Sequence, residues 1–143
     1  MNPFLFLFTN FEVAFVSDIV LNDLSTRSKI FYSLRPYFYK QSIVKCGLAA
    51  GITVVAALLP TMFAFYLATG TFVPHNSTTL LQFSLLAFIL GVILDIFICK
   101  MKIFGNRLDD FYKEYGAGFL GGAAFVFSVV ISYFIQKNLK RVL

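Results

Sequence analysis

The sequence predicts an all-α integral membrane protein with three transmembrane helices, and three observations point to this class. Apolar residues make up 59% of the 143 residues, only 13% are charged, and nineteen are Phe. Soluble domains carry about 25% charged residues, and a domain this small has too much surface to hide so many apolar side chains. The few charges are also clustered rather than scattered. These properties argue against a water-soluble enzyme, a disordered tail and a disulfide scaffold.

Runs without charge predict where the chain crosses the membrane. Residues 46–94 contain no Asp, Glu, Lys or Arg, and at about 1.5 Å per residue this run is too long for one crossing of a core about 30 Å thick. A polar stretch with Gly and Pro at 69–79 divides it. Backbone groups in lipid must be paired within their own segment, so the spans should be helices. We expect these spans at about 43–68, 80–99 and 115–136.

Residues 1–42 are expected to form a Phe-rich segment that precedes a transmembrane domain of residues 43–143. The apolar beginning is interrupted by Glu12 and Asp18, which favours an interfacial or partner-covered helix, with a fourth span as the alternative. Residues 24–45 alternate basic and aromatic side chains, a pattern typical of a membrane interface. The same alternation can stack on nucleic-acid bases. Its position directly before a span favours the lipid bilayer, so we expect no nucleic-acid partner.

The distribution of Lys and Arg predicts the orientation in the membrane. Basic residues precede the first span and occupy the loop at 100–114, whereas 70–79 contains none. The first two regions should therefore face the cytoplasm and 70–79 the other side. The basic tail at 137–141 would lie on that other side, so either the third span crosses anyway, which we favour, or it is re-entrant, or the tail meets an anionic partner. Asn76 begins an N-x-Thr sequon, which is a glycosylation site or a chance tripeptide.

Asp95 is the acidic residue that the pattern places inside a span, where a charge is unfavourable and often functional. One interpretation is an interfacial acid paired with Lys45 or Lys100. The other is a proton or cation site, which would need a second buried ionisable group, and Lys45 is the candidate partner at a similar depth. Cys46 and Cys99 are expected at the same membrane face, as buried thiols or as palmitoylation sites.

Two GxxxG motifs predict close helix packing. Gly47 and Gly51 lie in the first expected span, and Gly118 and Gly122 lie in the third. Small residues let helix backbones approach closely in lipid. The motifs therefore predict either packing of the first span on the third or association with neighbours, including a homo-oligomer.

No motif in the sequence indicates catalysis. His75 is the only histidine, and a single His without clustered acids or thiols cannot build a metal site. Phosphate-binding glycine loops, dinucleotide-binding glycines and zinc-protease motifs are all missing. We therefore expect no enzyme activity, no catalytic, cofactor or metal site, and no small-molecule substrate.

Several short segments carry a resemblance to a known family. They are Leu34–Phe38, Ser42–Lys45, Ala49–Thr53, Asp110–Gly118 and Gly121–Ala124. Together they resemble small multipass membrane proteins of nucleocytoplasmic large DNA viruses, especially algal ones. The resemblance implies a structural component of the virion internal membrane or a host-derived endomembrane. Such a minor capsid-associated protein would link the bilayer to capsid proteins, with no catalytic residues to carry over.

Two other functions fit the same sequence. One is an accessory subunit of a large membrane complex, for instance in the mitochondrial inner membrane. The other is a small oligomeric channel or transporter in which Asp95 lines a pore.

Overall fold

The computed structural model describes residues 2–30, 42–101 and 114–142. This part of the chain contains no strand and forms four helices: α1 (Pro3–Arg27), α2 (Ile43–Thr69), α3 (Ser77–Met101) and α4 (Glu114–Val142). The predicted all-α class is confirmed for these residues. Most of the basic-aromatic region and most of the expected loop at 100–114 lie outside the described residues.

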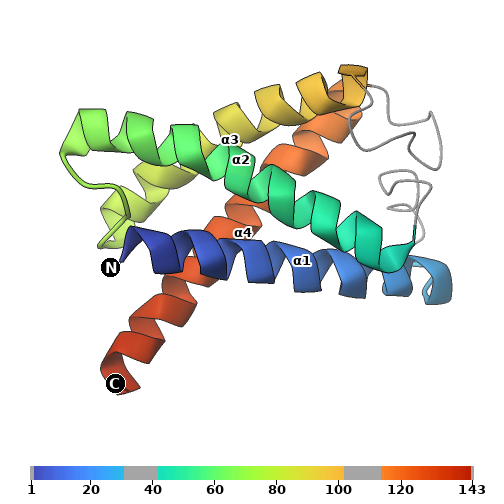
Figure 1. Ribbon diagram of the computed structural model, residues 1–143, viewed down its shortest axis with the longest axis horizontal. Helices are drawn as coiled ribbons and strands as arrows, with labels where there is room; N and C mark the ends of the chain where they lie inside the picture. Colours follow the sequence, from blue (N-terminus) through green and yellow to red (C-terminus); the bar gives the residue numbers. More distant parts are fainter. Residues whose placement is uncertain (1, 31–41, 102–113, 143) are drawn as a thin grey trace.

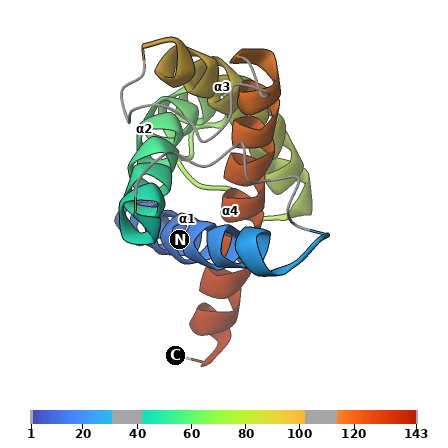
Figure 2. The ribbon, with the colours of Figure 1, turned by 90° about the vertical axis from the view of Figure 1, so that its right-hand side faces the viewer.

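Consecutive helices run in opposite directions (Figure 1). The beginning of α1 and the turn between α2 and α3 lie at one end of the molecule, on the left of the figure. The end of α1, the beginning of α2, the end of α3 and the beginning of α4 lie at the other end. The C-terminal part of α4 extends past α1 (Figures 1 and 2).

Each of the four helices contains a stretch long and apolar enough to cross a membrane. The expected spans at 43–68, 80–99 and 115–136 fall within α2, α3 and α4. The expected number of three is one too low, because α1 also qualifies. Glu12 and Asp18 do not interrupt it, since a continuous helix carries both, with Glu12 exposed and Asp18 partly buried.

Side-chain caps explain where α1 begins and glycine explains where α2 ends. The Oδ1 atom of Asn2 accepts hydrogen bonds from the backbone N–H groups of Phe4 (2.8 Å) and Leu5 (3.4 Å), and Pro3 occupies the first turn, where its missing N–H is not needed. Gly70 ends α2 with φ 82°, a left-handed conformation that favours glycine.

The polarity of α1 is inverted relative to a helix of a soluble protein. Its fully buried residues include Asn10 and Ser25, each 0% exposed, whereas Phe4 and Phe8 are 78% and 59% exposed. Soluble proteins bury large apolar side chains and expose polar ones. A helix in contact with lipid instead presents apolar side chains on its outer surface. The outward apolar face of α1 therefore fits contact with a bilayer.

Along α3, large apolar side chains also face outward, and they do so at regular intervals. Large apolar side chains are exposed at every fourth position, while the opposite face is buried. Residues four apart lie on one face of a helix, so these side chains form a continuous outward stripe. The stripe consists of Leu81, Leu85, Ile89, Ile93, Phe97 and Met101.

Polar contacts hold α1 against α4. The buried hydroxyl of Ser128 donates to the side-chain oxygen of Asn10 over 3.0 Å or to its backbone oxygen over 3.1 Å. Further along, the Gln136 amide donates to the Thr9 hydroxyl over 3.4 Å. Hydrogen bonds between helices stabilise association in lipid, so α1 belongs to the bundle rather than lying beside it.

Phenylalanines from three helices pack together near the turn between α2 and α3. Phe83 contacts Phe65 at a ring-centroid distance of 5.2 Å and Phe6 at 5.8 Å, both edge to face. This geometry suits the charge distribution of aromatic rings. Phe6 is completely buried, so the Phe-rich beginning of the chain contributes directly to the core.

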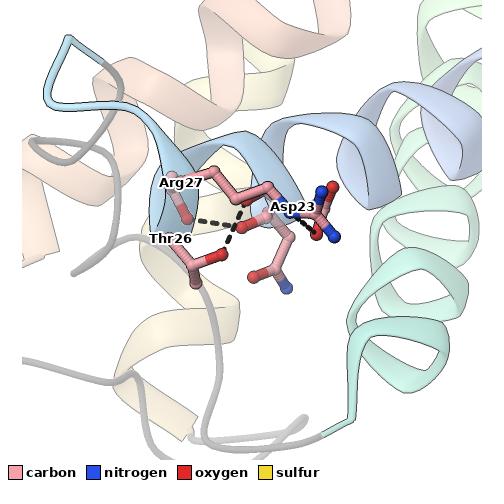
Figure 3. Close-up of polar contacts among 5 residues, drawn as sticks. Asp23, Thr26 and Arg27 are labelled. Carbon is pink, nitrogen blue, oxygen red and sulfur yellow. Dashed lines mark hydrogen bonds and ion pairs between the residues drawn. The ribbon is translucent and has the colours of Figure 1, made fainter.

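Near the end of α1, Asp23 makes polar contacts with Thr26 and Arg27 (Figure 3). Arg27 forms an ion pair with Asp23 over 3.2 Å, and the Thr26 hydroxyl donates to the backbone oxygen of Asp23 over 2.7 Å. The Arg27 and Asp23 side chains are 76% and 45% exposed. An exposed pair of this kind contributes about 1 kcal/mol or less.

Candidate functional site

A cavity of about 370 Å³ lies among the four helices, and all four contribute to its lining. It lies between the pair α1–α2 and the pair α3–α4, which diverge at the end of the molecule that faces the viewer in Figure 2. Helices within each pair pack extensively, whereas α2 and α4 touch only sparsely. The cavity thus occupies the space that this divergence leaves.

Two carboxyl groups line the cavity from different helices. Asp95 of α3 is only 3% exposed. Asp18 of α1 is partly exposed, and its Oδ2 atom is buried. The sequence-based hypothesis of a proton or cation site at Asp95 needed a second ionisable group, and Asp18 is such a group in the same cavity.

Glycine makes room for the buried carboxyl group. A Cβ atom at Gly121 of α4 would lie 2.5 Å from Asp95 Cγ and 2.7 Å from Asp95 Cβ. On α3, a Cβ atom at Gly91 would lie 2.9 Å from a ring carbon of Phe125 and 3.3 Å from the Cα atom of Gly122. The backbones of α3 and α4 therefore approach closely enough that Asp95 fits only against glycine.

The described glycines of the two GxxxG motifs lie against different helices: Gly47 and Gly51 against α1, and Gly122 against α3. A Cβ atom at Gly51 would lie 2.6 Å from the Phe11 ring of α1, and Gly47 similarly faces α1. At Gly122 the corresponding distance is 2.5 Å, to Val92 of α3. The surroundings of Gly118 lie outside the described residues.

Lys45, the sequence-based candidate partner of Asp95, is exposed and does not belong to the cavity lining. Its neighbour Cys46 is 2% exposed and lines the cavity. The side chains of Cys99 and Lys100 lie outside the described residues.

Asn76 lies at the beginning of α3 and shapes the turn there. Its Oδ1 atom accepts a hydrogen bond from the Thr79 backbone N–H over 2.9 Å. In return the Thr79 hydroxyl accepts from the backbone N–H groups of Asn76 (2.9 Å) and His75 (3.0 Å). The sequon asparagine is therefore an exposed helix cap. Within the described part of the chain, no three His, Cys, Asp or Glu side chains gather as metal ligands would.

Apart from the two acids, the cavity wall consists of apolar, small and hydroxyl-bearing side chains. Phe125 and Phe127 contribute aromatic surface, and Ser17, Thr53 and Ser128 contribute hydroxyl groups. The wall is exposed on one flank of α4, and a positively charged group placed inside would find carboxyl groups and aromatic side chains in one cavity. The remaining lining residues are Ala14, Leu21, Cys46, Ala50, Val54, Ala57, Gly91, Leu120, Gly121, Ala123 and Ala124.

The position of Asp18 carried a signal in the sequence. Asn10, Ala14, Asp18, Asn22 and Ser25 recur every three or four residues, so they share one helical face. Small and polar residues along one stripe of an otherwise apolar helix indicate an inward face. That Asp18 and Asp95 line the same cavity depends on tertiary packing and has no local signal.

The described residues define a class: a helical protein whose four described helices are able to cross a membrane and which has acidic side chains lining a cavity between them. No protein-family model matches the chain. Comparison with curated proteins and with solved structures found no significant match either.

Proposed function

We propose that this chain is a multipass membrane protein that binds a cation inside its helix bundle, as the binding unit of a small channel or transporter. A single observation carries the proposal: Asp18 and Asp95, from two different helices, line one cavity. Ionisable residues within membrane spans are unfavourable and mark ion or substrate pathways. This proposal takes up the alternative of a small channel or transporter that uses Asp95, and it departs from the sequence-based expectation of no small-molecule substrate.

The location of the cavity supports a pathway rather than an isolated site. Cys46 lies in the first turn of α2 and Asp95 in the last part of α3, so the carboxylates lie toward the end of the bundle that the basic residues predict to be cytoplasmic. From there the cavity extends inward to Ala57 and Ser128. A cation that enters at this end would meet the acids before reaching the middle of the bundle.

Flux measurements on the reconstituted protein test this function. Purified wild type in phosphatidylcholine liposomes is expected to admit rubidium ions or protons, followed with a tracer and an internal pH dye. Asp95→Asn and Asp18→Asn, which remove the charge but keep the volume, should reduce flux to the level of protein-free liposomes. Asp23→Asn is the matched control because Asp23 is an exposed acid outside the cavity. Absent wild-type flux, or unchanged flux in Asp95→Asn, would contradict the proposal.

A structural function at a virion membrane is the second proposal. Beyond the resemblance, its support is that the C-terminal part of α4 extends past α1 (Figure 1) and carries Lys137, Lys140 and Arg141 in sequence. This basic end would suit an anionic protein or lipid surface. Localisation of the protein by immunogold labelling in its native assembly tests it, and labelling confined to membranes without an adjacent protein shell would contradict it.

A further inference from the structure

We propose that the cavity binds an organic ammonium ion carrying an apolar group. This inference rests on the proposed cation-binding function and names the ligand class. A site for such a molecule needs a negative charge and an apolar surface, and the described lining offers both.

The composition of the wall favours an organic cation over Ca²⁺ or Mg²⁺. Hard metal cations such as Ca²⁺ and Mg²⁺ require a shell of six or more oxygen ligands. Apart from Asp18 and Asp95, the described lining side chains offer only three hydroxyl oxygens, at Ser17, Thr53 and Ser128. Most of the wall is carbon, which suits the hydrocarbon part of an ammonium compound.

Aromatic side chains add a second kind of recognition. Phe125, which is only 2% exposed, and Phe127 line the same cavity as the two acids. Ammonium groups are attracted to the faces of aromatic rings, and proteins use this attraction to bind quaternary ammonium ligands. Carboxylates and phenyl rings around one space are therefore complementary to a quaternary ammonium ion in particular.

The size of the cavity also fits this ligand class. Small-molecule sites span about 300–1,000 Å³, and the cavity measures about 370 Å³. A single inorganic ion would occupy a small fraction of this volume. An ammonium group with one ring-sized substituent would fill it better.

The exposed part of the wall indicates how the ligand enters. Ala123, Ala124 and Phe127 of α4 line the cavity and are exposed at the surface of the bundle. Their exposed surface is apolar, and neighbouring outward residues such as Phe119 face the same surroundings. A cation with an apolar group concentrates at a bilayer, so this flank of α4 offers it a second route besides the end of the bundle.

Binding of tritiated benzyltrimethylammonium to the full chain in phosphatidylcholine nanodiscs tests the inference, with empty nanodiscs as background. We expect saturable binding by wild type and by Asp23→Asn. The double variant Asp18→Asn/Asp95→Asn should bind about tenfold more weakly or less. Equal binding by the double variant and wild type, or no binding above background, would overturn the inference.

Two further measurements separate a specific apolar pocket from simple charge attraction. Tetramethylammonium, which lacks the ring, should compete about tenfold more weakly than unlabelled benzyltrimethylammonium. Ala123→Leu and Ala124→Leu should each weaken binding by narrowing the flank, whereas Ala68→Leu, at an exposed site on α2 outside the cavity, should not. Circular dichroism confirms that each variant is folded. Equal competition by tetramethylammonium would refute recognition of the apolar group.

The flux assay distinguishes failure of this inference from failure of the proposed function. If benzyltrimethylammonium does not bind but rubidium or proton flux still depends on Asp95, the cavity serves an inorganic cation and only the ligand class is wrong. If binding and flux are both absent, both proposals fail.

Discussion

Replacement of Gly121 by Ala is expected to destabilise the bundle, although alanine is the better helix former. The new methyl group would lie 2.5 Å from Asp95 Cγ and 2.7 Å from Asp95 Cβ. Carbon atoms pack favourably at about 3.5–4.0 Å, so both contacts are too short by about 1 Å. The carboxyl group can rotate away, but the Cβ atom is fixed to the backbone of α3. The steric clash is therefore relieved only if α3 and α4 move apart.

The opposing contributions to the free energy of unfolding can be compared directly. Adding a methylene-sized group to a tightly packed site destabilises by about 1–3 kcal/mol, whereas exchange of glycine for alanine in a helix stabilises by at most about 1 kcal/mol. We expect a net loss of about 1–2 kcal/mol for Gly121→Ala. In an Asp95→Ala background the carboxyl group is gone, so part of the loss should disappear, with a coupling of about 0.5 kcal/mol or more.

Far-UV circular dichroism during unfolding by sodium dodecyl sulfate in mixed micelles measures this loss. The chain contains no Trp, so indole fluorescence offers no signal. Gly47→Ala is the matched control. Its nearest contact is 2.9 Å to a side-chain carbon of Ile19, which can shift without moving a helix, so the loss should be smaller. A Gly121→Ala protein at least as stable as wild type would refute the packing argument.

Three further predictions concern α1. A double-mutant cycle of Asn10→Ala and Ser128→Ala should yield a coupling of about 0.6 kcal/mol, typical of hydrogen bonds in lipid, and zero coupling would show that the contact is not formed. In a background without native cysteines, Asn2→Cys and Lys29→Cys should react with impermeant thiol reagents from opposite sides of the membrane, and reaction from one side would show that α1 does not cross. Glu12→Leu should favour insertion of α1 into microsomes by about 3–4 kcal/mol, the difference between an acid and Leu at a helix centre, because Glu12 is exposed on a membrane-length helix. Unchanged insertion would mean that a partner or the interface already accommodates this acid.

The three later helices could be predicted from the sequence because the energy of placing a charge in lipid acts locally. A run without charge, ended by basic residues or by Gly and Pro, defines a span whatever its neighbours are. This explains why α2, α3 and α4 contain the expected segments at 43–68, 80–99 and 115–136. Such reasoning needs no knowledge of tertiary packing.

The same reasoning undercounted α1 because it treats every acid as an interruption. It ignores the face on which the acid lies. Asp18 shares its face with Asn10 and Asn22, which are buried, so the other helices shield these polar groups. The cavity itself could not be predicted, since it depends on how the pair α1–α2 diverges from the pair α3–α4.

Positions one or two turns apart on the inward face of α1 differ in whether their residues serve stability or function. Asn10 is matched by the Ser128 hydroxyl in a packed contact, and Ala14, one turn later, lines the cavity as a small apolar residue. Another small apolar residue would pack equally well at the position of Asp18. A carboxyl group there, with a second at the buried Asp95, places two ionisable groups along the cavity that packing alone does not require.

If the acids serve binding, their removal should stabilise the protein while abolishing its activity, as for residues that trade stability for function. We therefore expect the variant Asp18→Asn/Asp95→Asn to resist dodecyl sulfate better than wild type by about 0.5–2 kcal/mol, while it loses cation flux. Asp23→Asn, which alters an exposed ion pair, should change stability by about 1 kcal/mol or less. A double variant less stable than wild type would instead show that the two carboxylates hold the helices together. The energetic argument for a ligand site would then be wrong.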